Sequence, residues 1–162
     1  MPDNLQAIEA FRAKVQGTNI NEQTLLATDY LNHLNEPIML FEMLADVPEL
    51  LEELAEWQPK SYADHFADST FKEKDLAIEA YDVAPGKYRE PFDETVENAK
   101  QCISTAIDAM TKLVEQERSD DIRVVATEVS KILGSLVDRA SAIINGQVDR
   151  VAQSEIDEIM GG

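Results

Sequence analysis

Apolar residues along the chain recur every three or four positions instead of every second position, which is the spacing of helices. In the first segment this spacing is kept by Leu5, Ile8, Phe11 and Val15. Asp3 stands before the segment as a candidate N-cap, and Gly17 follows it where a C-terminal cap is expected. We therefore predict a first helix between Asp3 and Gly17.

A second helix is predicted over residues 22–35, followed by a run that is almost wholly apolar. Its core-facing positions would be Leu25, Leu26, Tyr30, Leu31 and Leu34. Pro37 lacks the amide hydrogen that a helix interior needs, so it should kink or restart the helix. Residues 38–44 read Ile-Met-Leu-Phe-Glu-Met-Leu, so we expect them to be buried on most sides, at the centre of the N-terminal core.

Three further short helices are predicted from residue pairs with the spacing of an N-cap and an acid three positions later. The pairs are Asp46 with Glu49, Ser61 with Asp64, and Thr70 with Glu73. Gln58-Pro59 and Pro85-Gly86 mark helix ends. Residues 1–86 are therefore interpreted as a region of short helices.

The pattern over residues 87–146 is more regular, because its apolar side chains follow alternating steps of four and three. The first series is Phe92, Val96, Ala99, Ile103, Ala106, Met110 and Leu113. The second series is Ile122, Val125, Val129, Ile132, Leu136, Ala140 and Ile143. Pro91 suits the first turn of the first helix, and a polar break at 118–121 separates the two series. This pattern predicts an antiparallel helical hairpin with arms of about 35 to 40 Å at ~1.5 Å per residue.

A two-helix hairpin buries only one seam well, so it requires another apolar surface. The N-terminal helices could supply it within a compact bundle, or a second copy of the chain could supply it in a dimeric four-helix bundle. The sequence leaves both open. The predicted fold class is all-α, with the short helices of 1–86 packed on the hairpin of 87–146 and a short helical tail over 147–162.

The composition is strongly acidic, with 32 Asp and Glu against 14 Lys and Arg and a formal net charge of -18. Such a surface repels phosphate backbones and anionic lipid headgroups, so we expect neither nucleic acid nor a membrane as a partner. No apolar run approaches the roughly 20 residues of a membrane span, and the opening residues lack an export signal. The single cysteine, Cys102, fits a reducing compartment. We expect a cytoplasmic protein without a cofactor.

No motif in the chain predicts a particular enzyme chemistry. It has no Gly-x-Ser-x-Gly, no phosphate-binding glycine loop and no paired zinc ligands. Asp29, His33 and Glu36 could share one helical face as oxygen and nitrogen ligands, so a small bundle that binds metal or ligand there is one alternative. Their spacing alone is weak, and no metal is predicted. His65 is expected to be a surface or capping residue.

The tail is amphipathic. A helix that begins at Gln153 or Ser154 would place Ile156, Ile159 and Met160 on one face. A helix of this length is not stable alone. We therefore expect it to dock on its own protein or on a partner. Residues 151–160 resemble the short peptide by which the flagellar-motor switch protein and the chemotaxis phosphatase bind the chemotaxis response regulator.

Those peptides have the form Ser-Gln-x-Glu-Ile-Asp-x-Leu-Leu. The residues that match as they stand are Gln153, Glu155, Ile156 and Asp157. Ile159 and Met160 replace the leucines, and Ala152 stands in place of the serine. The layout is also similar to that of the chemotaxis phosphatase family, in which a helical hairpin forms a dimeric four-helix bundle and carries this peptide on a C-terminal tail. The resemblance implies a receiver-domain partner and a homodimer through the hairpin.

Phosphatase activity of that family requires an acid and a glutamine one helical turn apart in the hairpin, which position a water for attack on the receiver's phospho-aspartate. The surrounding family motif is absent here, and the nearest pair is Glu97 with Gln101. Our leading hypothesis is therefore a non-enzymatic helical interaction protein of a motility or two-component pathway, which binds a receiver domain through residues 153–160. A phosphatase of the same regulator is the first alternative.

Overall fold

The computed structural model describes residues 3–147, and in that range it contains helices and no strand. The helices are α1 (Leu5–Val15), α2 (Leu31–Leu44), α3 (Leu51–Glu56), α4 (Tyr62–Ala67), α5 (Lys74–Val83), α6 (Gly86–Glu115) and α7 (Ser119–Ile144). Two single 3-10 turns, Thr28–Tyr30 and Pro48–Leu50, precede α2 and α3. The predicted all-α class is confirmed. None of the described helices is long and apolar enough to cross a bilayer.

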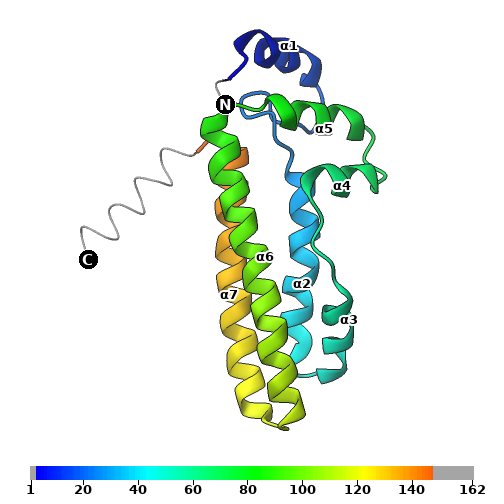
Figure 1. The fold of residues 1–162 in the computed structure, drawn as a ribbon, viewed down its shortest axis with the longest axis vertical. Helices are drawn as coiled ribbons and strands as arrows, with labels where there is room; N and C mark the ends of the chain where they lie inside the picture. Colours follow the sequence, from blue (N-terminus) through cyan, green and yellow to red (C-terminus); the bar gives the residue numbers. More distant parts are fainter. Residues whose placement is uncertain (1–2, 148–162) are drawn as a thin grey trace, which may run out of the picture.

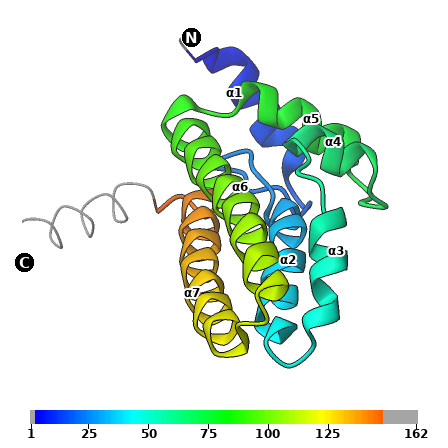
Figure 2. The ribbon, with the colours of Figure 1, turned by 60° about the horizontal axis from the view of Figure 1, so that its bottom comes forward.

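The longest elements are α6 and α7, which are about 45 Å and 39 Å long at ~1.5 Å per residue. Residues 116–118 join them, and they lie side by side in opposite directions (Figure 1). α2 packs along α7 and α3 lies beside α6 (Figure 2). An N-terminal helix therefore covers part of the surface that the two long helices leave open. At one end of this bundle, α1, α5 and α4 form a group of shorter helices.

The buried face of α6 agrees with its predicted seam, whereas that of α7 differs in part. Six of the seven predicted α6 positions are buried, and Leu113 is partly buried. On α7, Ile132 was a predicted core residue but is 50% exposed, and Leu133 is fully buried in its place. The physical reason is that α7 packs against α2 as well as α6, so its buried stripe is turned toward α2 and includes Ala126.

The predicted second helix over 22–35 is wrong at its start, because α2 begins at Leu31. Residues before it form a turn in which the Asn21 carboxamide oxygen accepts hydrogen bonds from the Gln23 and Thr24 amides, at 2.8 and 3.0 Å. Leu25 adopts a positive φ of 62° there, which a helix does not allow. The local side-chain bonds of Asn21 thus compete with helix formation.

Both prolines predicted at helix boundaries lie inside helices. α2 continues through Pro37, and α6 begins at Gly86, five residues before Pro91. Asp3 is not the cap of α1 either, because the Asn4 side chain accepts from the Ala7 amide at 3.1 Å. Asp3 instead accepts a hydrogen bond from the Gly86 amide at 3.0 Å, at the N-terminus of α6. A carboxylate at that end is favoured by the unpaired amides and the helix dipole.

Of the three predicted short-helix caps, only Ser61 caps its helix, by accepting from the Asp64 amide at 3.1 Å. Asp46 instead pairs with Arg123 of α7 at 3.0 Å. Thr70 lies before the start of α5, whose N-cap residue is Glu73. The N-cap pattern therefore located each short helix to within a few residues, but it identified the capping residue correctly only for α4.

Candidate functional site

Residues 57–61 connect α3 to α4 without regular structure, and we call them the strap. The strap is held against α2 by His33. The Lys60 amide donates to His33 Nε2 at 2.9 Å, and Trp57 Nε1 donates to the His33 carbonyl at 3.3 Å. The Trp57 and His33 rings also stack, with centroids 4.8 Å apart. Tyr30 adds a hydrogen bond from its hydroxyl to the Lys60 carbonyl at 2.6 Å.

Pro37 explains why the His33 carbonyl is available to Trp57. In an uninterrupted helix the amide at position 37 would donate to the carbonyl at position 33, but proline has no amide hydrogen. The indole of Trp57 supplies the missing donor. The proline inside α2 thus creates an attachment point for the strap.

His33 is buried and neutral at physiological pH. Because its Nε2 accepts from the Lys60 amide, the ring proton resides on Nδ1. Burial lowers the pKa of His33 to about 4, and the positive charges of His65, Lys100 and Lys60 contribute in the same direction. His33 therefore holds the strap as a hydrogen-bond acceptor.

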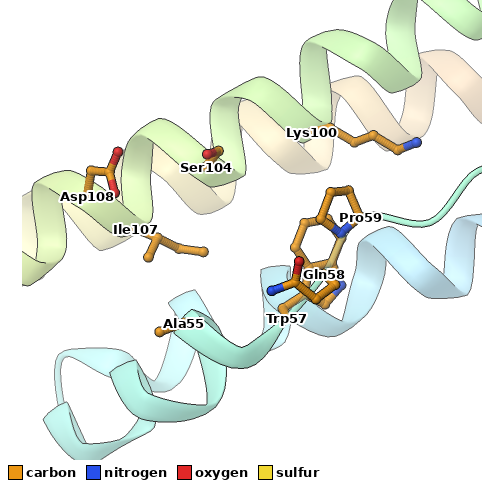
Figure 3. Close-up of a pocket in the computed structure, with 8 residues that line it drawn as sticks. All are labelled: Ala55, Trp57, Gln58, Pro59, Lys100, Ser104, Ile107 and Asp108. Carbon is orange, nitrogen blue, oxygen red and sulfur yellow. The ribbon is translucent and has the colours of Figure 1, made fainter.

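Three adjoining cavities lie between the strap and α6, and all of them include Lys100. We call them together the strap cleft. The first, of about 260 Å³, contains Trp57, Gln58 and Ser104 in its wall (Figure 3). The second, of about 370 Å³, lies between Pro59 and α6. The third, of about 190 Å³, is bounded by aromatic side chains of several helices.

Lys100 is half-buried at the centre of the strap cleft. Within residues 3–147 it forms no hydrogen bond or ion pair, and its ammonium group lies 5.9 Å from the centroid of the Tyr30 ring. Burial lowers the pKa of Lys100, while the carboxylates of Glu97 and Asp93 oppose that change. The cleft therefore presents one unpaired cation beside acidic side chains.

At one end of the cleft Tyr81 donates from its hydroxyl to Asp93 at 2.6 Å. Burial raises the pKa of Asp93, although the hydrogen bond from Tyr81 and the charges of Arg89 and Lys100 favour its ionised form. Burial also raises the pKa of Tyr81, so its hydroxyl remains a donor at neutral pH. Tyr81 and Asp93 therefore form a hydrogen-bonded polar wall at this end of the cleft.

The structure brings together one predicted pair of site residues. Glu97 and Gln101 are exposed one turn apart on α6, and both line the 370 Å³ cavity beside Lys100. A water or an incoming side chain at this position would meet a carboxylate, a carboxamide and an ammonium group. This combination can orient a nucleophilic water and neutralise negative charge.

The three candidate metal ligands are not brought together. His33 Nε2 is occupied by the Lys60 amide, Asp29 bonds His65 Nε2 at 3.0 Å, and Glu36 is exposed on α2. In the part of the chain that the structure describes, no group of three or more His, Cys, Asp or Glu side chains could hold a metal ion. The metal-binding alternative therefore finds no support there.

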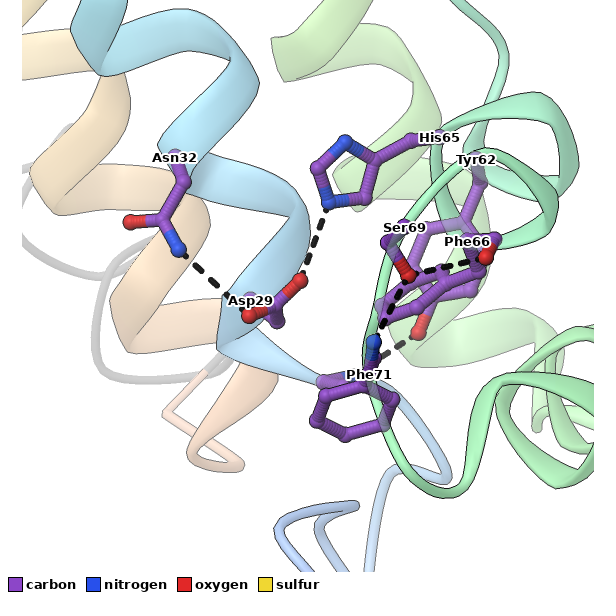
Figure 4. Close-up of polar contacts among 8 residues, drawn as sticks. Asp29, Asn32, Tyr62, His65, Phe66, Ser69 and Phe71 are labelled. Carbon is purple, nitrogen blue, oxygen red and sulfur yellow. Dashed lines mark hydrogen bonds and ion pairs between the residues drawn. The ribbon is translucent and has the colours of Figure 1, made fainter.

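His65 was expected at the surface but is partly buried, because Asp29 holds it against the start of α2. The Asp29 carboxylate lies between His65 and Asn32, as Figure 4 shows. The His65 ring also meets the Tyr30 ring edge to face, with centroids 5.3 Å apart. This contact fastens α4 to the start of α2.

The six predicted partner-binding residues lie outside the described residues. They are Gln153, Glu155, Ile156, Asp157, Ile159 and Met160. Sequence reasoning missed Trp57 and Lys60 of the strap, and Lys100 in the strap cleft. The absence of Lys and Arg between Val15 and Pro59, followed at once by Lys60, was the one signal that set this region apart. No protein-family model matches the chain, and neither a curated protein nor a solved structure matches it.

Proposed function

We propose that this protein is a helical interaction protein that binds a response-regulator receiver domain through residues 153–160. The observation that carries the proposal is the order Gln-Ser-Glu-Ile-Asp-Glu-Ile-Met in that segment. Its acids and apolar residues fit a receiver surface that is basic and hydrophobic, because charge attraction guides the encounter and apolar burial holds the complex.

The arrangement of the helices supports this role. The packed core extends as far as Ile144, and Gly146 has a positive φ of 85°. A glycine in this conformation commonly ends a helix, so α7 ends before the proposed binding segment begins. Binding through residues 153–160 would therefore not require α7 to unfold.

The test is titration of the host's receiver domains, with and without a phosphoryl mimic such as beryllofluoride, into the full chain. We expect micromolar binding, on the order of -8 kcal/mol. Binding should fall at least tenfold in the variant Ile156→Ala/Ile159→Ala and disappear in a chain that ends at Asn145. Val124→Ala removes an equally apolar side chain that is 61% exposed on α7, and it should bind normally. If no receiver binds the full chain, the proposal is wrong.

A second candidate function is supported by the position of Glu97 and Gln101. In the phosphatase alternative, their side chains would orient a water that attacks the phosphorus of the receiver's phospho-aspartate. The bond between phosphorus and the aspartate oxygen would break, releasing inorganic phosphate and the free aspartate. The exposure of the pair on α6, beside Lys100, leaves room for a receiver to approach.

This candidate is tested by the rate at which a phosphorylated receiver loses its phosphoryl group. We expect the full chain to increase this rate and Gln101→Ala to reduce the increase by about 100-fold, because the attacking water loses a group that orients it. Asn98→Ala replaces a neighbouring exposed carboxamide on α6 and serves as the matched control. An unchanged rate with the full chain would leave receiver binding as a non-enzymatic function.

A further inference from the structure

A second surface of this protein is an apolar groove between α3 and the last turns of α6. Its cavity is about 520 Å³, and its wall is mostly apolar. Pro48, Leu51 and Ala55 line one side, and Thr111 and Val114 line the other. The Thr111 hydroxyl donates to the Ile107 carbonyl at 2.8 Å, so it is already satisfied within α6. The groove therefore offers apolar contact and few polar groups.

The groove continues toward the strap cleft, because Ala55 lines both cavities. Ser104, Ile107, Thr111 and Val114 follow one another along α6 on this side. They span about 15 Å at ~1.5 Å per residue, which is close to three helical turns. Apolar side chains at positions i, i+4, i+7 and i+11 of a docked helix extend over about 16 Å, which is close to this length.

The rim of the groove is acidic. Glu49 and Glu52 both line it, and neither forms an ion pair within the described range 3–147. The stretch from Val15 to Pro59, which supplies one whole wall, contains nine acidic residues and no Lys or Arg. An occupant with Lys or Arg beside its apolar stripe would meet unpaired carboxylates on this rim.

Helical segments form both walls of the groove: the 3-10 turn Pro48–Leu50 and α3 on one side, and α6 on the other. They offer no open edge to an extended peptide, so an occupant with an internally bonded backbone is favoured. A second copy of the chain would bring another net charge of -18, and residues 148–162 contain four acids and one Arg. Both are disfavoured by the acidic rim.

From these observations we propose that the groove binds a basic amphipathic helix of a partner protein. The apolar stripe of that helix lies on Leu51, Ala55 and Val114, and its Lys or Arg side chains lie beside Glu49 and Glu52. This surface does not involve residues 153–160, so the proposal is independent of receiver binding.

The test uses a capped synthetic helix of 14 residues, with leucines at i, i+4, i+7 and i+11 and lysines beside them, titrated into the full chain at 150 mM salt. We expect micromolar binding that Ala55→Arg weakens at least tenfold, because it places bulk and positive charge in the groove. Ala13→Arg makes the same change at an exposed position of α1 and should bind normally. Glu49→Gln/Glu52→Gln should weaken binding and reduce its salt dependence.

Two control peptides separate docking from general attraction to an acidic protein. One has the same composition with its leucine stripe scrambled, and the other has glutamate in place of lysine. Equal binding of either peptide, or normal binding to Ala55→Arg, would overturn the proposal. Circular dichroism of each variant confirms that it is folded. The variant Ile156→Ala/Ile159→Ala should bind the basic helix normally, so failure of the receiver proposal would not affect this result.

Discussion

At the scale of single residues, the strap depends on His33 acting through its ring and its carbonyl at once. The ring accepts from Lys60 and the carbonyl accepts from Trp57, so one residue of α2 holds two residues of the strap. Protonation of His33 would remove its ring acceptor and leave the Lys60 amide facing a second donor. The residue therefore links the position of the strap to pH.

The first prediction is that stability falls as pH decreases from about 6.5 to about 4. The pKa of His33 in the folded protein is below its unfolded value of 6.5, so the folded state favours the neutral ring and the unfolded state binds the proton more readily. Stability from this group is therefore present above pH 6.5 and lost as pH falls toward 4, by about 1 to 3 kcal/mol.

Urea denaturation at pH 7 and at pH 4.5 measures this loss. His33→Gln keeps a hydrogen-bond acceptor that does not titrate, so the difference between the two pH values should be smaller than in the natural chain. Asn35→Ala changes an exposed, non-titrating side chain of the same helix and should retain the full difference. An equal difference in the His33 variant would contradict the role given to this residue.

At the scale of elements, the termini of helices are set by contacts from distant segments. Asp3 illustrates this, because it precedes α1 in sequence but bonds the first amide of α6. The prediction is that Asp3→Ala destabilises the fold by about 1 kcal/mol, through the loss of a cap and of a favourable charge at the α6 N-terminus. Glu42→Ala removes an exposed acid of α2 that forms no ion pair within residues 3–147, and it is the control for charge alone. Equal unfolding midpoints for the two variants would refute the capping role.

Residue spacing in the sequence predicted whole helices better than the contacts between them. Helical spacing was enough to predict the class and the buried face of α6, because that face repeats over many turns. It could not predict that Leu133 replaces Ile132 in the core, since this depends on where α2 lies against α7. Nor could it predict the strap cleft, because Trp57 and Lys100 are far apart in sequence and meet only through the packing of α3 on α6.

At the scale of the whole molecule, one buried hydrogen bond connects the N-terminal turn to the end of the last described helix. The Thr24 hydroxyl donates to the Ile144 carbonyl at 2.6 Å, and Thr24 is fully buried. Beside it Gln23 donates to the Tyr88 hydroxyl at 2.6 Å, which adds α6 to the same junction. The turn before α2, the start of α6 and the end of α7 are therefore held at one place.

The corresponding prediction is that Thr24→Val destabilises the protein by about 1 to 3 kcal/mol, because a carbonyl at the α7 C-terminus loses its buried donor while the shape of the side chain is kept. Thr24→Ser retains the hydroxyl and should recover most of that loss. Thermal unfolding of the three proteins gives the values. A valine variant as stable as the natural chain would show that water or another donor satisfies Ile144.

The junction at Thr24 also has a consequence for the order in which the protein is made. Its hydrogen bond spans 120 positions of sequence, and α2 packs mainly on α7, the last helix in the described chain to be synthesised. While α7 is still inside the ribosome, Leu34, Phe41 and Leu44 have no α7 to pack against. The nascent N-terminal region therefore carries an uncovered apolar face until α7 emerges, and the nine acids without a Lys or Arg between Val15 and Pro59 repel the same segment of neighbouring nascent chains.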